Sequence, residues 1–530
     1  MMEKNRRLFI SRLKQTLTGK YLSVDEISEQ ETEFLVWKNQ LPEVCRLMLE
    51  QRGGRLFTMV GSDERGWTGT LALYYVFAFD KTQQFVTMKT LISEEEPTFP
   101  SQAAEFPAFN WYEREVKDLL GLRPQGHPDP RPLTLHGDWP EEIHPLRKDF
   151  PAGEWVARVE SREAFMRYQG QDVTEIPVGP IHAGIIEPGH FRFGAVGDTV
   201  LHLDARLFYT HRGLEKISEG QPLAKALFIA ERICGVCALS HAVAYAQAVE
   251  SAAATEVPLR ARYLRTLFLE LERLYNHIGD VGNACAGFGL AVGISQGARL
   301  REELLQLNER IAGHRYLRGI VALGGMRRDL SAAEFADILH TLNRVETEFQ
   351  AIVEIILSHD IAINRMHNTG VLTLQQAVDL AVVGVAARAS GRDIDVRRDQ
   401  PYAAYDRVKF SVPVYPEGDV LARIRVRIDE VTQSCHIVRQ VLAQIEPGPV
   451  CCELPPIVPH RRGIGWVESS KGETVHWLLV GTDETVDRYR VRSATFSNWP
   501  AVPLTVPGNI VPDFPLINKS FELCYACCDR

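Results

Sequence analysis

The sequence lacks the features that would place it across a membrane or on a nucleic acid. No uninterrupted apolar stretch is long enough to span a bilayer, and the first seven residues lack the apolar core of a secretory signal. The net charge is -9 and no dense basic run occurs, which argues against a general nucleic-acid binder. We therefore expect protein partners, and we expect any membrane association to come through other subunits.

Nucleotide-binding loops and repeats are also missing. The sequence contains no Gly-x-Gly-x-x-Gly or Walker-type loop, so it predicts no nucleotide site of its own. No internal repeat or low-complexity tract appears. A length of 530 residues, with 45% hydrophobic and 24% charged residues, is ordinary for a globular protein of two or more domains.

Cysteine is scarce, with 10 residues in 530, yet four of them form two C-x-x-C pairs. Cys234 and Cys237 lie near the middle of the sequence, and Cys524 and Cys527 lie within its last seven residues. This spacing lets two thiolates reach one metal, and the lack of an export signal indicates a reducing compartment. Four thiolates suit structural zinc, an iron-sulfur cluster or a nickel centre, whereas two unrelated pairs of buried thiols would bind nothing.

The fold class predicted from the pattern is α+β, with a small mixed α/β domain at residues 1–150. Alternating segments at 71–77 and 84–88 predict half-buried strands, and 111–122 predicts an amphipathic helix that ends at Gly121. The proline-rich stretch 131–150 is expected to be extended.

Residues 151–175 are expected to link this domain to a second one, 176–530, which is mainly a helical bundle with peripheral β-strands. Along one helical face, Glu270, Arg273 and His277 predict a salt-bridged structural surface. The expected helices are 223–249, 259–278, 298–311, 332–357 and 420–427, and the expected strands are 408–414, a hairpin over 465–477, and 489–495.

Two groups of residues resemble known families. The helix 111–122 together with His144-Pro145-Leu146-Arg147-Lys148-Asp149 resembles the chain-C-type peripheral-arm subunit of NADH:quinone oxidoreductase (complex I). Arg232-Ile233-Cys234-Gly235-Val236-Cys237 with His241 resembles the first metal-binding motif of NiFe-hydrogenase large subunits. Cys524-Tyr525-Ala526-Cys527, followed by Asp529-Arg530, resembles the second motif.

The combination of these motifs is similar to one particular class. The D-type subunit of complex I has the hydrogenase fold but lacks the cysteines. A chain-C-like domain fused to a cysteine-bearing chain-D-like domain resembles the large subunit of membrane-associated NiFe-hydrogenases of the formate hydrogenlyase type. The resemblance covers nearly the whole sequence.

The resemblance implies a NiFe centre in which nickel is held by Cys234, Cys237, Cys524 and Cys527. Cys237 and Cys527 would bridge to an iron that carries carbon monoxide and cyanide. The implied activity is reversible H2 formation and cleavage, with proton reduction the expected direction. Cys524 would take the proton, and Glu187 matches the proton-gate glutamate. The residues implied to lie around the ligands are His241, His190, His182 and Arg232.

The resemblance also implies a set of partners. Electrons would leave through a small iron-sulfur subunit related to the B-type subunit of complex I, because no iron-sulfur cluster is expected in this protein itself. Further ferredoxin-like subunits, integral membrane subunits, a maturation protease and nickel chaperones are implied. The protein would lie in the cytoplasm, peripheral on the inner membrane through these partners.

Two positions depart from the family pattern and keep an alternative open. Glu522-Leu523 stands where Asp-Pro is usual, and Lys471 stands where an arginine usually covers the bimetallic site. A lysine keeps the positive charge of arginine but lacks the planar guanidinium group, which can donate two parallel hydrogen bonds. Lys471 is a candidate catalytic residue. The alternative is a complex I-like quinone or electron-transfer subunit without a working NiFe centre. An assembly module with structural zinc is a third possibility.

Overall fold

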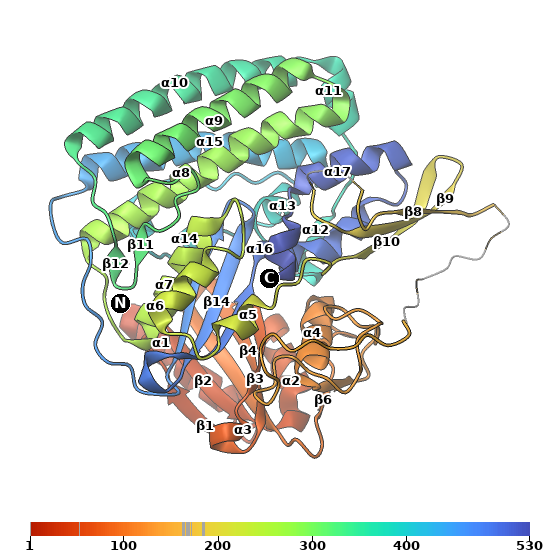
Figure 1. Cartoon of the computed structure of the whole chain (residues 1–530), viewed down its shortest axis with the longest axis vertical. Coiled ribbons are helices and arrows are strands. Elements are labelled where there is room, and N and C mark those ends of the chain that lie inside the picture. The colour runs from red at the N-terminus through yellow and green to blue at the C-terminus, as the bar shows by residue number, and fades with distance from the viewer. Residues whose placement is uncertain (1, 52, 162–164, 166–169, 171, 183–185) are drawn as a thin grey trace. The chain divides into compact units, whose positions relative to one another are not determined.

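The computed structural model describes the chain apart from residues 1, 52, 162–164, 166–169, 171 and 183–185. It divides into two compact units. The first comprises Met1–Phe165, Glu215–Glu219 and Asp379–Ala381, and the second comprises Met166–Leu214, Gly220–Val378 and Val382–Arg530. A strand-rich N-terminal unit and a largely helical second unit confirm the predicted α+β class (Figure 1).

The first unit is built on a five-stranded sheet of order β1-β2-β5-β4-β3, in which only the β2–β5 pairing is parallel. Every residue of β4 is buried, as are residues 84–88 of β5, so the expectation of half-buried strands at 71–77 and 84–88 was wrong. The reason is that all nine residues of β4 are apolar, which suits a strand covered on both faces. The elements are α1 (Met2–Thr16), β1 (Tyr21–Glu26), β2 (Glu31–Val36), α2 (Leu41–Arg46), β3 (Arg55–Asp63), α3 (Arg65–Thr68), β4 (Leu71–Phe79), β5 (Gln84–Ile92), β6 (Thr98–Pro100), α4 (Asn110–Leu120) and β7 (Arg123–Gln125).

Helix α4 forms where the sequence predicts it and ends at Gly121. Gly121 adopts φ 75°, and its N–H bonds back to Lys117 O, which closes the last turn. The helix packs against β3, where Gly61 leaves room for Leu120. Asp118 of α4 accepts hydrogen bonds from the backbone N–H groups of Leu133 and Thr134. These bonds hold the proline-rich segment in place, although it forms no regular secondary structure.

The second unit is dominated by four long helices, α8, α9, α10 and α15, which pack on one another (Figure 1). Its elements include β8 (Thr174–Val178), β9 (His190–Val196), β10 (Thr199–Arg206), α6 (Leu223–Ala230), α7 (Ala238–Ala252), α8 (Leu259–Ala284), α9 (Ala291–Ala312), β11 (Val321–Ala322), β12 (Gly325–Met326), α10 (Ala332–Leu357), α11 (Asp360–Met366), α13 (Gly384–Ala389), α14 (Val396–Asp399), α15 (Val420–Gln444), β13 (Arg462–Ser469), β14 (Gly472–Val480), β15 (Val486–Arg492), α16 (Ala494–Asn498), α17 (Phe514–Phe521) and α18 (Tyr525–Asp529). Most of α12 (Leu374–Asp379) also belongs to this unit, whereas α5 (Leu214–Ser218) belongs to the first unit from Glu215 onward.

Helix α7 lies directly on the antiparallel sheet β13-β14-β15. Two glycines of β13 allow this contact, since a Cβ at Gly463 would lie 1.8 Å from Ala248 O and one at Gly465 would lie 2.0 Å from Ala244 O. The glycines thus bring the helix backbone against the sheet. The close packing fixes the start of α7 relative to the β13–β14 turn, and both carry candidate site residues.

Two expectations for this unit were wrong in detail. The helix expected over 223–249 is broken into α6 and α7, because the first cysteine pair occupies a non-helical loop between them. No strand forms at 408–414. There, Lys409 N and Ser411 N donate to the side chains of Gln440 and Gln433 on α15, so these N–H groups are satisfied without a strand partner.

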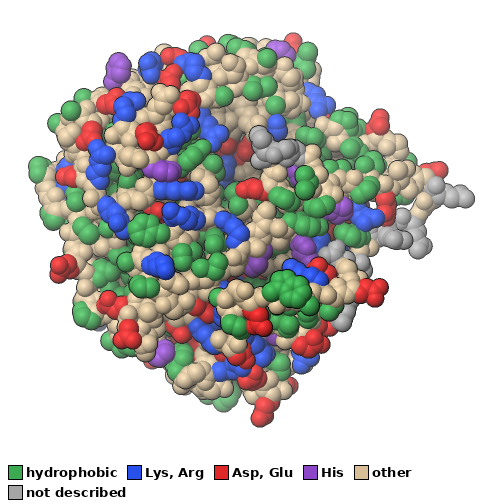
Figure 2. Space-filling model, viewed as in Figure 1, with side chains coloured by type: hydrophobic (Ala, Val, Ile, Leu, Met, Phe, Trp, Pro, Cys, Tyr) green, Lys and Arg blue, Asp and Glu red, His purple; other side chains and the backbone are tan. Residues whose placement is uncertain are grey.

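Among the described residues, no helix combines the length and apolar character needed to cross a membrane. On the face shown in Figure 2, side chains of both charges are interspersed with apolar ones.

Candidate metal centre

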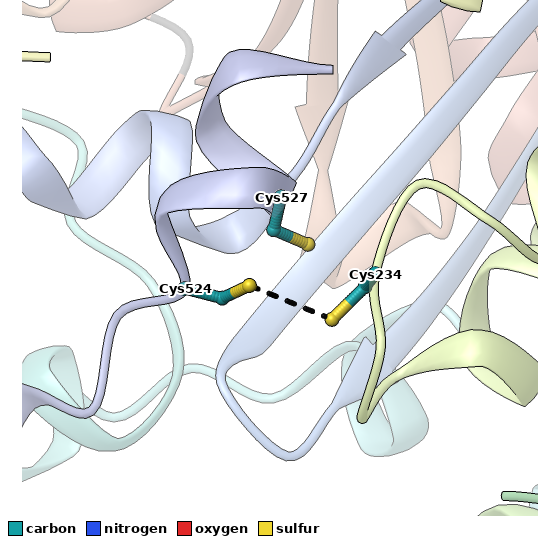
Figure 3. Close-up of side chains that lie close together, drawn as sticks. All are labelled: Cys234, Cys524 and Cys527. Carbon is teal, nitrogen blue, oxygen red and sulfur yellow. Dashed lines mark hydrogen bonds between the residues drawn. The ribbon is translucent and has the colours of Figure 1, made fainter. Parts of the chain in front are cut away.

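The two cysteine pairs meet in the second unit although 290 positions separate Cys234 from Cys524. Cys234 and Cys237 belong to the α6–α7 loop, Cys524 is the N-cap of α18, and Cys527 lies within α18. The Sγ atoms of Cys234, Cys524 and Cys527 lie within 4.8 Å of one another and point toward one another (Figure 3). The distance from Cys234 Sγ to Cys524 Sγ is 3.8 Å.

Cys237 borders the same group without joining that trio. Its backbone N–H donates to Cys234 Sγ at 3.2 Å, and its own Sγ lies 3.9 Å from Ser470 Oγ in the β13–β14 turn. Hydrogen bonds from the other three thiols hold the pKa of Cys234 well below its ordinary value. Hydrogen bonding to Cys234, together with burial, raises the pKa of the other three. The four thiols therefore favour a single thiolate, and a bound cation would be needed to ionise more of them.

Helix α7 begins at the cysteine loop, and a buried carboxylate satisfies its first N–H groups. Glu272 on α8 accepts hydrogen bonds from Leu239 N at 2.9 Å and Ser240 N at 3.1 Å, and it also accepts from the Ser240 hydroxyl. Burial raises the pKa of Glu272 to about 8. Glu272 thus fixes the helix end that carries Cys237.

His241 is brought to the cysteines as expected. One turn beyond Cys237 on α7, its Nε2 lies 3.0 Å from Cys527 Sγ. Its other ring nitrogen, Nδ1, lies 2.9 Å from His476 Nε2. His476 comes from β14, and sequence reasoning missed it because nothing in its local pattern marks it.

Lys471 occupies the β13–β14 turn beside the cysteines, and its Nζ donates to Asp280 Oδ2 at 2.8 Å. Burial acts to lower the pKa of Lys471, but the charge of Asp280 outweighs it and raises the pKa. Conversely, burial opposes ionisation of Asp280, yet Lys471 and Arg427 hold its pKa below the ordinary value. Asp280 is a second residue that sequence reasoning missed.

Lys471, Glu187 and Cys524 line one cavity of about 600 Å³, together with Asp280 and Glu522. Burial raises the pKa of Glu187, while the backbone N–H groups of Tyr525 and Ala526 act in the opposite direction. Burial and the charge of Asp280 raise the pKa of Glu522 to about 6. The cavity therefore places carboxyl groups able to hold a proton beside a cysteine.

The other expected residues lie farther out. The Arg232 side chain is exposed, donating to Phe228 O and pairing with Glu231. His190 Nδ1 lies 3.2 Å from Gly179 O on the β8–β9 side, outside the residues that line the cavity. The His182 ring packs against Tyr525 in α18, so it touches the helix of the second cysteine pair.

The helical face containing Glu270, Arg273 and His277 is ion-paired as expected, but it is buried. Arg273 donates to Glu468 O at 2.6 Å and to Ser469 O at 3.2 Å. His277 Nε2 lies 2.8 Å from Glu430 Oε2 on α15. This buried network holds the end of β13, and with it the turn that carries Lys471.

Comparison with family models defines the class of protein. Residues 34–155 match the respiratory-chain NADH dehydrogenase 30 Kd subunit, and residues 288–465 and 456–530 match the 49 Kd subunit. Residues 212–279, which contain the first cysteine pair, match the nickel-dependent hydrogenase family. The protein is thus a fusion of the two complex I-type domains with a hydrogenase-type segment around Cys234 and Cys237.

Relatives that match over the whole length make the class more specific. The sequence is 35% identical to formate hydrogenlyase subunit 5 of Escherichia coli K12, over 100% of this chain and 94% of the relative. It is 34% identical to hydrogenase-4 component G of the same organism, over 98% and 92%. The chain belongs to the family of formate hydrogenlyase-type hydrogenase large subunits. It is also 29% identical to the C/D subunit of NADH-quinone oxidoreductase from Bacteroides fragilis, over 92% of this chain and 97% of the relative.

Proposed function

We propose that this protein is the catalytic large subunit of a NiFe-hydrogenase complex. The complex would catalyse the reversible formation and cleavage of H2, with proton reduction as its main direction. The observation that carries the proposal is the convergence of buried Cys234 and Cys527 with half-buried Cys524 in one group, with Cys237 beside it. The 35% and 34% identities to two hydrogenase subunits support the same assignment.

The residues at the centre fit a nickel site. Soft thiolates suit nickel, and the second pair reaches the first only because the whole helical unit folds between them. Cys234, Cys237, Cys524 and Cys527 would hold a centre of nickel and of iron that carries carbon monoxide and cyanide. When bound, the centre would supply the redox chemistry that splits H2 into a hydride and a proton.

The protein's own residues would handle the proton. Cys524 and Glu187 line the same cavity, and burial raises the pKa of Glu187, which favours the protonated form of this carboxyl group. Lys471 would place a positive charge over the same space, oriented by its hydrogen bond to Asp280. Cys524 would exchange the proton with Glu187, which would pass it outward.

Partners and location follow from the same proposal. Electrons would leave through a small iron-sulfur subunit related to the B-type subunit of complex I, with ferredoxin-like and integral membrane subunits completing the complex. A maturation protease and nickel chaperones would install the metal. The protein would sit peripherally on the cytoplasmic face of the inner membrane through these subunits.

The test compares cysteine variants of the purified complex. Cys234→Ser and Cys527→Ser should lose nickel and H2-dependent dye reduction, whereas Cys435→Ser, which changes a buried cysteine on α15, should keep both. Wild-type complex with zinc in place of nickel would favour the assembly-module alternative. The complex I-like alternative would be favoured if the wild-type complex contained neither metal but carried out quinone-linked electron transfer. The 29% identity to a C/D subunit of NADH-quinone oxidoreductase is the observation that supports this alternative.

A further inference from the structure

A column of hydrogen-bonding groups leads away from Cys527 through the interior of the second unit. His241 Nε2 lies 3.0 Å from Cys527 Sγ, and His241 Nδ1 lies 2.9 Å from His476 Nε2. His476 Nδ1 lies 2.7 Å from the Tyr489 hydroxyl. The four groups come from α18, α7, β14 and β15, and all four are buried.

The positions of the protons in this column can be derived one after another, starting from its cysteine end. A thiolate that binds a metal can only accept a hydrogen bond, so His241 must donate from Nε2. A neutral imidazole that donates from Nε2 accepts at Nδ1, so His476 donates from its own Nε2. His476 Nδ1 then accepts, and the Tyr489 hydroxyl is the donor. Burial lowers the pKa of His476 well below its ordinary value and so favours its neutral form.

We propose that His476 and Tyr489 are positioning residues that fix the tautomer of His241 and so maintain the N–H···S hydrogen bond to Cys527. The inference rests on the proposed metal centre, because the metal removes the proton from Cys527. A donor directed at a ligating sulfur withdraws charge from it and thereby tunes the metal. Tyr489 is linked to Cys527 through the two intervening imidazole rings.

Tyr245, a neighbour of the column, provides a matched control. Tyr245 is buried and packs edge-on against Tyr489 with ring centroids 5.3 Å apart. Its hydroxyl donates to Leu223 O at 3.0 Å, away from both histidines. A Tyr→Phe change there removes a buried hydroxyl from the same cluster and leaves the column intact.

Two readouts test the inference in the purified complex: ¹⁵N spectra of labelled histidine, which report tautomers, and the infrared carbon monoxide band of the iron. Tyr489→Phe should mix the His241 and His476 tautomers and shift the band to lower wavenumber, because the sulfur becomes a stronger donor. Tyr245→Phe should change neither readout. His476→Leu should shift the band in the same direction, and His476→Gln, whose amide can still donate to His241, should restore it.

The outcomes separate this inference from the proposed function. Wild-type complex that shows the band, with Tyr489→Phe and His476→Leu leaving band and tautomers unchanged, would overturn the inference and leave the metal centre standing. A band shift of equal size in Tyr245→Phe would also overturn it, because general loosening would then account for the effect. Wild-type complex without nickel and without the band would overturn the proposed function and this inference with it.

Discussion

Replacing Asp280 by asparagine removes the counter-charge of Lys471 without changing the size of the side chain. Asp280 accepts from Lys471 Nζ at 2.8 Å and lies 3.4 Å from Arg427 Nε. The Lys471 side chain is only 4% exposed, so water compensates only in part for the lost partner. Arg427 remains bonded to Ser520 O and is affected less.

The expected cost follows from the burial of this pair. Removing one partner of a buried ion pair costs about 3–5 kcal/mol, because the other charge stays in the interior. Glu522 also lines the cavity, and its pKa, raised to about 6 partly by Asp280, should fall when Asp280 is neutral. A nearby carboxylate of this kind offsets part of the loss. We therefore expect about 3 kcal/mol, or roughly a hundredfold in the unfolding equilibrium constant.

Urea denaturation followed by tryptophan fluorescence measures this change, and a double variant isolates the pair. Asp280→Asn with Lys471→Met removes both charges and should recover at least about 1.5 kcal/mol of the loss. Asp337→Asn, which breaks an exposed pair with Arg310, should cost no more than about 1 kcal/mol. A cost for Asp280→Asn equal to that of Asp337→Asn, or no recovery in the double variant, would refute the reasoning.

Three further changes test the fold of the two units, the first of them in the N-terminal unit and the others in the second unit. Burial raises the pKa of Glu113 to about 7, so the folded state binds more protons than the unfolded state between pH 4.5 and 7. The free energy of unfolding should therefore fall by about 3 kcal/mol as the pH rises through this range. Glu113→Gln should abolish this pH dependence in urea titrations at several pH values. Gly465→Ala would place a Cβ 2.0 Å from a backbone carbonyl of α7 and should cost at least about 2 kcal/mol, whereas Gly66→Ala, which meets open space, should be nearly neutral in thermal denaturation. Glu430→Gln should cost about 3–5 kcal/mol, because Arg388 donates to Glu430 twice in the interior, and an unchanged urea midpoint would contradict this.

Local patterns in the sequence were enough to predict several elements of the fold. The helix ending at Gly121 and the hairpin of β13 and β14 both follow from signals within a few residues. The break between α6 and α7 was missed, because the apolar period continues through the cysteine loop. The absent strand at 408–414 was missed for a different reason: its N–H groups are satisfied by two glutamines on α15, a helix that follows later in the sequence.

The candidate site was predictable only where its chemistry lies in short motifs. The spacing of the two C-x-x-C pairs predicted a shared site, and His241 lies one turn from Cys237 on the same helix. Asp280, His476 and Tyr489 carry no such signal, because each acts through a partner that is distant in the sequence. A single sequence does not reveal such long-range pairings. Their roles emerged from the three-dimensional contacts.

The most direct measurement is metal analysis combined with infrared spectroscopy on the purified complex. We predict nickel and iron in near-equal amounts and the stretching bands of iron-bound carbon monoxide and cyanide. We also predict that Cys234→Ser abolishes both the nickel and the bands. Complex that contains neither nickel nor these bands would contradict the central claim, and the protein would then be a complex I relative whose cysteines serve another purpose.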